Sequence, residues 1–272
     1  MRELRRWPLY LVALGTLLLA GFPLLWMGYT ALKTNAQISA NVWALPHPPT
    51  GENLVQAWQS GGFRRAYFNS LLVAVLAGLM AALFSAGAGY AFARLRFRGR
   101  EVLFYLFLAG MVLPIHITLI PLYTLLERLG LRNTYGALLG PYTAFALPVS
   151  ILILRGFFAG LPRELEEAAV LDGCSVWGRF WRLALPLSRP AMATVVIFNF
   201  VAMWNELVFA LTFIDRPHLR TLPLALMEFS AEHGWDLAGV NAALVLAVYP
   251  ALGVYFLAQR HIIRGLTAGA LQ

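Results

Sequence analysis

The sequence predicts an all-α, polytopic membrane protein with six transmembrane helices. Of its 272 residues, 60% are hydrophobic and only 12% are charged. The mean hydropathy is +0.68, and a soluble domain of this length could not bury so much apolar surface. The apolar residues also gather in uncharged runs of roughly 20 residues, the length with which a helix crosses the hydrocarbon core of a bilayer.

Six such runs follow one another along the chain. The first lies between Arg6 and Lys33, and it is too long for the core of a signal peptide, so we expect it to be a retained span. The other five runs are 66–93, 102–126, 132–155, 190–214 and 237–259. Only the fifth is interrupted by a carboxylate, Glu206.

Small residues recur at four-residue spacing in the second run. One row is Gly78, Ala82 and Ala86, and the other is Ala81, Ser85, Gly89 and Ala93. Small side chains at this spacing let helix backbones approach closely, so we expect tight helix packing here. An ordinary alanine-rich composition is the alternative.

The distribution of basic residues predicts the orientation. Fourteen arginines fall at the two termini, in the 94–100 loop and in the 155–189 segment, against seven basic residues on the opposite side. Basic loops stay in the cytoplasm, so both termini and the 155–189 segment are expected there. The formal net charge of +8 therefore reflects membrane topology, and we predict no nucleic-acid partner. The single cysteine, Cys174, excludes an internal disulfide and offers no metal-ligand spacing, so neither a metal nor a cofactor is predicted.

The segment 161–186 interrupts the apolar pattern with two short amphipathic helices. Pro162 suits the start of the first helix, and Gly173 suits its left-handed end. Ser175 can cap the second helix, which Pro186 is expected to end. Such a pair predicts either a protein-docking surface or an amphipathic helix lying on the lipid headgroups.

A family resemblance favours the docking surface. The segment contains Glu167-Ala168-Ala169, then three residues, Gly173, nine residues, Leu183, one residue and Leu185-Pro186. This pattern resembles the signature loop of permease subunits in bacterial ABC importers. Four stretches are similar to the maltose-type second permease subunit of the carbohydrate-uptake branch: LPRELEEAAVLDGCS, IPLYTLLERLGLRNTYGALL, WNELVFAL and RGLTAGALQ. Residues 1–65 are less distinctive, so we divide the chain into a first helix with its external loop, 1–65, and a permease core, 66–272.

The resemblance implies a type I ABC importer permease fold in a bacterial inner membrane. It implies four kinds of partner: a second permease subunit completing a heterodimer, a cytoplasmic ATPase dimer, an extracytoplasmic solute-binding protein and the lipid bilayer. This chain would form half of the translocation path for a carbohydrate. It would not be an enzyme and would have no catalytic residue, because it lacks the GxxxxGK[ST] phosphate loop and the ATPase subunits hydrolyse ATP.

The same resemblance assigns the coupling helix that docks on the ATPase to the 161–186 loop. The docking residues implied are Glu166, Glu167, Ala168, Ala169, Leu171, Asp172, Gly173 and Trp177.

A second candidate site lies in the fifth run, at Trp204, Asn205 and Glu206. A carboxylate inside a membrane normally faces a partner or a wet cavity, which predicts that these residues line the translocation path or its gate. For Glu206 the alternatives are a structural hydrogen bond to a neighbouring helix or a position near the outer headgroups, where a charge costs less. Trp204 could stack on a sugar ring or anchor the interface, and we favour the anchor.

Other functions remain open at this point. A permease for a non-sugar solute such as glycerol phosphate shares much of the pattern. A self-sufficient secondary transporter would carry more intramembrane ionisable groups than Glu206 and His116, or an internal repeat. An intramembrane enzyme would need a metal-ligand pair such as HExxH, which is missing.

Overall fold

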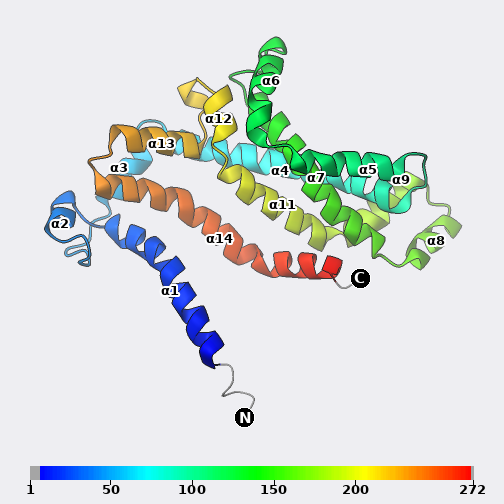
Figure 1. The fold of residues 1–272 in the computed structure, drawn as a ribbon, viewed down its shortest axis with the longest axis horizontal. Coiled ribbons are helices and arrows are strands. Elements are labelled where there is room, and N and C mark those ends of the chain that lie inside the picture. The colour runs from blue at the N-terminus through cyan, green and yellow to red at the C-terminus, as the bar shows by residue number, and fades with distance from the viewer. Residues whose placement is uncertain (1–6, 271–272) are drawn as a thin grey trace. The chain divides into compact units, whose positions relative to one another are not determined.

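A computed structural model describes residues 7–270, with the side chains of Pro8 and residues 257–270 left undescribed. The terminal arginines used above to predict orientation, Arg2, Arg5 and Arg6, lie outside the described residues. All regular elements in the described part are helices (Figure 1).

Four helices are long and apolar enough to cross a membrane. They are α1 (Trp7–Thr30), α4 (Phe63–Arg94), α7 (Gly136–Ala159) and α14 (Leu237–Ala270). Two further spans are bent pairs, so the described residues hold up to six spans. One pair joins α5 (Arg100–Ala109) with its one-turn extension η1 (Gly110–Val112) to α6 (Ile115–Arg128), and the other joins residues 176–187 to α11 (Arg189–Trp204). The predicted helical membrane architecture is confirmed.

The third predicted run forms a broken span. It is bent by 102° between η1 and α6. Leu113 takes an extended conformation (φ −74°, ψ 114°) and Pro114 follows it as the cap of α6. A proline disfavours helical geometry in the residue before it, which explains why the apolar run breaks here.

The chain divides into two compact units, Met1–Arg64 with Ala225–Pro250, and Arg65–Leu224 with Ala251–Gln272. The first holds α1, α2 (Asn35–Ala40), α3 (Glu52–Gln59), most of α13 (Leu222–Glu232) and the start of α14. Within it, Asn35 donates to Asp236 Oδ1 at 2.7 Å, and the Tyr249 hydroxyl donates to the Leu24 carbonyl at 3.0 Å. These bonds join the amino-terminal part of the unit to the start of α14.

The second unit packs α4, α7 and α11 side by side. Asn69 near the start of α4 accepts from Tyr135 just before α7, and Arg94 at the end of α4 donates to Phe158 near the end of α7. These two helices therefore run parallel, and α11 runs antiparallel to α7, because Asn199 donates to the buried Ser150 hydroxyl at 3.0 Å while Glu206 meets Tyr142. The ends of α4 and α7 and the start of α11 thus lie together.

The small-residue rows of α4 make the close approaches that the sequence predicts. A Cβ at Gly78 would lie 3.7 Å from the Val196 carbonyl oxygen in α11. One at Gly89 would lie 3.0 Å from the Arg155 nitrogen and 3.1 Å from the Leu154 Cβ in α7. One glycine of each row therefore makes a close approach, Gly78 to α11 and Gly89 to α7, and tight helix packing is confirmed.

Candidate functional site: the loop between α7 and α11

The first helix of the loop is α8 (Arg163–Leu171). Pro162 caps it in an extended conformation, and Glu164 and Glu166 in its first turn favour the positive end of the helix dipole. Gly173 takes φ +77° beyond its end. The Gly173 amide bonds to the Val170 carbonyl at 3.0 Å and the Cys174 amide to the Ala169 carbonyl at 2.9 Å, the pair of bonds that defines a Schellman cap. The predicted left-handed end is confirmed.

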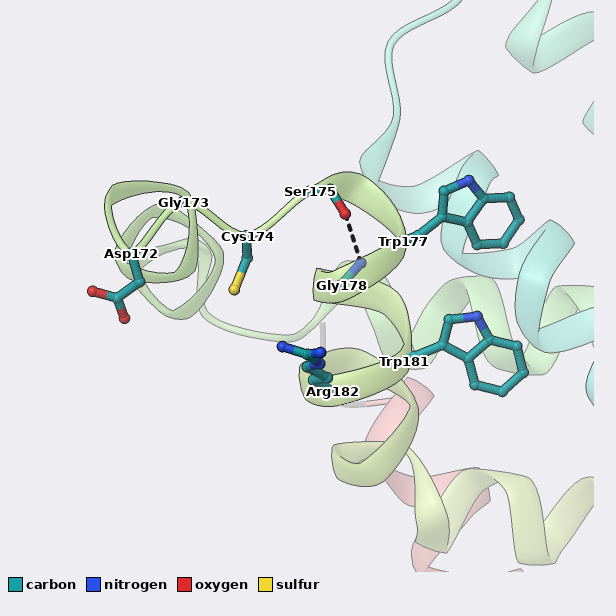
Figure 2. A pocket seen from close by; sticks show the side chains of 8 residues that line it. All are labelled: Asp172, Gly173, Cys174, Ser175, Trp177, Gly178, Trp181 and Arg182. Carbon is teal, nitrogen blue, oxygen red and sulfur yellow. Dashed lines mark hydrogen bonds between the residues drawn. The ribbon is translucent and has the colours of Figure 1, made fainter.

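The second helix begins where the sequence predicts and ends later. The Ser175 hydroxyl accepts from the Gly178 amide at 3.1 Å and so caps α9 (Val176–Arg179) (Figure 2). A π-helical turn, η2 (Phe180–Ala184), and α10 (Leu185–Leu187) continue it. Pro186 was expected to end this helix and does not. The Leu185 amide bonds five residues back to Phe180, and this wider turn accommodates a proline that lacks an N–H, so the 73° bend falls at Ser188 instead.

Most of the predicted docking residues lie on the surface of the protein. Glu167, Ala168, Asp172 and Gly173 are exposed, Leu171 is 88% exposed and Trp177 is 72% exposed, while Ala169 is half-buried. A cavity of about 560 Å³ lies between the end of α8 and α9. Figure 2 shows Trp177 and Trp181 projecting to one side of this cavity, away from Asp172 and Cys174. Large apolar side chains exposed in a group mark an interaction surface.

Glu166 differs from the other predicted docking residues, because it faces its own chain. Its carboxylate lies 3.5 Å from Arg94 Nε and 3.7 Å from an Arg179 guanidinium nitrogen, and the side chains of Arg94 and Glu166 are only 7% and 14% exposed. Arg94 also donates to the Phe158 carbonyl at 2.8 Å and to the Leu161 carbonyl. Arg94 and Glu166 therefore tie α8 to the ends of α4 and α7.

Aromatic contacts make a second tie between α4 and the loop. Tyr90 of α4 meets Phe158 edge-on with ring centroids 5.6 Å apart, and it meets Phe180 of the π turn at 5.4 Å. All three rings are buried. Sequence reasoning did not single out Tyr90, Arg94 or Arg179 as functional. The one available signal was the position of Arg94 at the end of an apolar run.

Trp204 lies in the protein core and is not exposed at the membrane surface. Its ring is 3% exposed, stacks on Phe200 at 5.6 Å and meets Tyr67 edge-on at 5.3 Å. The favoured interpretation, an interfacial anchor, therefore does not fit its surroundings. Aromatic packing between α4 and α11 explains this residue.

Glu206 lies in the break between α11 and α12 (Val208–Phe213). One carboxylate oxygen accepts from the Tyr142 hydroxyl at 2.6 Å and the other from the Phe209 amide at 2.9 Å. Both bonds hold the break, which corresponds to the structural alternative raised from the sequence. Asn205 is exposed, and its amide donates to the Val201 carbonyl at 2.7 Å within its own helix.

Comparisons with known proteins agree with this architecture. The family described as binding-protein-dependent transport system inner membrane component matches residues 74–268. A putative ABC transporter permease of Caldicellulosiruptor sp. is 40% identical over 100% of this chain and 98% of its own. The trehalose/maltose transport system permease of Thermococcus litoralis is 35% identical over 100% and 99% of the two chains.

A diacetylchitobiose uptake permease of Streptomyces coelicolor is 34% identical over 92% of this chain and 83% of its own. Among solved structures, a chain of a bacterial ABC transporter that imports alginate superposes with a TM-score of 0.79 at 22% identity. That match covers 96% of this chain and 98% of the other, so the two share a fold.

Proposed function

Because this chain belongs to the family of binding-protein-dependent transport system inner membrane components, we propose that it is the permease subunit of an ATP-driven ABC importer for a carbohydrate. As a member of that family it is a multi-pass inner-membrane component and not an enzyme. It forms half of a translocation path with a second permease. A separate ATPase dimer supplies the energy, and an external binding protein delivers the solute.

The observation that carries this proposal is the geometry of α8. An exposed surface includes Leu171 at the end of α8 and Trp177 of the following α9, while Glu166 anchors α8 to its own chain. The loop that contains α8 and α9 leads into α7 at one end and into α11 at the other. An exposed apolar surface on a well-anchored helix suits docking on a partner better than lying on headgroups, since the anchoring fixes its orientation. We assign the docking surface to Glu167, Ala168, Leu171, Asp172, Gly173 and Trp177, with Ala169 at its edge and Glu166 supporting it from behind.

The carbohydrate substrate is supported by the names of the relatives. Those from Thermococcus litoralis and Streptomyces coelicolor are named for trehalose or maltose and for diacetylchitobiose. The match to the Thermococcus litoralis relative covers nearly all of both chains, so the whole chain takes part in that similarity. Glycerol phosphate remains the second candidate solute class.

The orientation that we propose places both termini and α8 in the cytoplasm, as the arginine distribution predicts. At the opposite end of α7 and α11, Glu206 fixes the break between α11 and α12. We propose that this break borders the translocation path, with the exposed Asn205 facing it.

The proposal is tested by reconstituting the permease with its second permease, ATPase and binding protein in vesicles. We expect uptake of a labelled sugar only when ATP and the binding protein are both present. Screening the binding protein against sugars and glycerol phosphate then identifies the solute. Uptake by the permease alone, without a nucleotide-hydrolysing partner, would contradict the proposal.

A further inference from the structure

A second cavity, of about 720 Å³, lies beside α8. Five arginines line it: Arg94, Arg96, Arg100, Arg163 and Arg179. Only two carboxylates, Glu166 and Glu167, face them. The cavity is therefore strongly basic, and its volume falls within the ordinary range for small-ligand sites.

Several lining residues lie where membrane-crossing segments begin or end. Arg94 is the last residue of α4, Arg100 is the first of α5 and Ala159 is the last of α7. All three mark points where an apolar, membrane-crossing segment begins or ends. The phosphate groups of a bilayer lie just outside the hydrocarbon core, so we expect them near this cavity.

The arginines keep hydrogen-bonding capacity that the described residues do not use. Glu166 is shared between Arg94 and Arg179 at 3.5 and 3.7 Å, distances too long for strong hydrogen bonds. The Nε atom of Arg179 is buried and makes no hydrogen bond to the described residues. A buried guanidinium donor without an acceptor is costly, so an acceptor entering from the cavity would satisfy it.

Arg100 is the one lining arginine that a strong ion pair already satisfies. It donates to Glu101 at 2.9 Å, and Arg155 donates to the same carboxylate at 2.8 Å. Arg96 and Arg163 line the cavity and are both exposed. They are free to move toward a ligand that enters.

We propose that this cavity binds the phosphate group of an anionic phospholipid beside the coupling helix. Arginine favours phosphate because its planar fork makes paired, charge-assisted hydrogen bonds. The acyl chains of such a lipid have an apolar route along α5, where Val102 and Leu103 are exposed next to Arg100. Glu167 and Leu171 of the proposed docking surface also line the cavity, so the lipid would lie next to the ATPase. The inference itself is argued from the arginines, and it goes beyond the proposed function.

The test measures lipid retention on the purified, assembled transporter. The transporter in detergent is titrated with phosphatidylglycerol or with phosphatidylcholine, and bound lipids are counted by native mass spectrometry. We expect the double variant Arg96→Gln, Arg163→Gln to bind phosphatidylglycerol roughly 10- to 30-fold more weakly, with binding of phosphatidylcholine unchanged. The matched control is Arg98→Gln, an exposed arginine of the same loop that does not line the cavity. It should bind like the parent.

Two further arms separate the possible sources of the anion. Millimolar inorganic phosphate should leave phosphatidylglycerol bound, and full displacement would make this a site for a soluble anion and overturn the lipid proposal. Equal retention by the double variant and the parent would also overturn it. So would a double variant that keeps its lipid and loses its ATPase subunits, because the arginines would then contact protein. Lipid retention is measured without transport, so failure here and failure of the proposed function are distinguishable.

Discussion

At the scale of single residues, Gly173 tests whether the shape of the α8 cap matters for coupling. Its φ of +77° strains a β-branched residue by about 1–2 kcal/mol, although space for a side chain exists because no atom lies within 4 Å of a built Cβ. We expect Gly173→Val to lower binding-protein-stimulated transport by about 5- to 30-fold while membrane insertion is preserved. Uptake and ATP hydrolysis are measured side by side in vesicles.

The matched control is Gly173→Asn. Asparagine tolerates the left-handed region, so this variant should keep most of the activity while adding a side chain of similar bulk. Equal loss in both variants would mean that side-chain bulk, and not backbone shape, is what the partner rejects. Full transport by the valine variant would count against a docking role for this turn.

Glu166 tests the anchoring of α8. Replacing it with Gln removes the charge that Arg94 and Arg179 share in a largely buried setting, which we expect to cost about 2 kcal/mol in the local stability of the loop. Hydrogen exchange of residues 163–171 should then speed up by about 30-fold. Glu164→Gln, an exposed neighbour on the same helix, should leave the exchange unchanged.

The local signals around this site could be predicted from the sequence, and its long-range contacts could not. A left-handed Gly173 and a capping Ser175 follow from residue types within a few positions of a helix end. The role of Glu166 depends on Arg94, which the fold brings from another span. A carboxylate on an amphipathic helix looks equally suited to an outside partner until that arginine is placed.

At the scale of elements, the contact between α4 and α7 depends on Gly89. A Cβ there would lie 3.0 Å from the backbone nitrogen of Arg155, so a larger side chain must push the two helices apart. We expect Gly89→Val to destabilise the protein by about 1–3 kcal/mol, seen as a lower Tm in a detergent thermal-shift assay.

Gly87 provides the control on the same helix. No atom lies within 4 Å of a Cβ built at Gly87, so Gly87→Val carries the same change in helix propensity without the clash. A similar loss of Tm in both variants would assign the effect to helix propensity and refute the close-packing interpretation.

A substitution of Glu206 tests the junction between α11 and α12. Glu206→Ala leaves the Tyr142 hydroxyl and the Phe209 amide without their acceptor, so the junction between α11 and α12 should loosen. We expect a change in transport or in the basal ATPase rate, with a smaller change for Tyr142→Phe, which removes only one of the two bonds. Unchanged rates in both variants would rule out a role for this junction in gating.

Two prolines have opposite effects on the helices that contain them. The run 102–126 bends beside Pro114, whereas the helix that Pro186 was expected to end continues past it. Hydropathy measures only how apolar a run is, while a proline can break a helix, as Pro114 does, or be absorbed by a wider turn, as Pro186 is. Which outcome occurs depends on the neighbouring backbone conformation.

At the scale of the whole molecule, the single cysteine offers a direct test of orientation. Cys174 is half-buried in the turn between α8 and α9. We expect a membrane-impermeant maleimide to label it in inside-out vesicles and not in right-side-out vesicles. The control is the variant Cys174→Ser with Trp235→Cys, because Trp235 is 79% exposed in the predicted outer loop. It should show the opposite pattern, and labelling of Cys174 from the outside would refute the proposed topology.

Membrane class and helix number could be predicted because they depend on composition and on run length. The parallel pairing of α4 with α7 and the antiparallel pairing of α11 could not, since neither composition nor spacing specifies which helices touch. Only the small-residue rows indicated that α4 has close neighbours. They did not indicate that α4 approaches α11 at Gly78 and α7 at Gly89.

The bond from Arg94 to the Phe158 carbonyl has a mechanical consequence. The loop containing α8 is covalently continuous with two spans, and this arginine fastens it to a third. A movement of the loop driven by the ATPase would therefore move three helices together, α7, α11 and α4. Loss of the Arg94 side chain should therefore leave ATP hydrolysis in place while α4 no longer moves together with the loop.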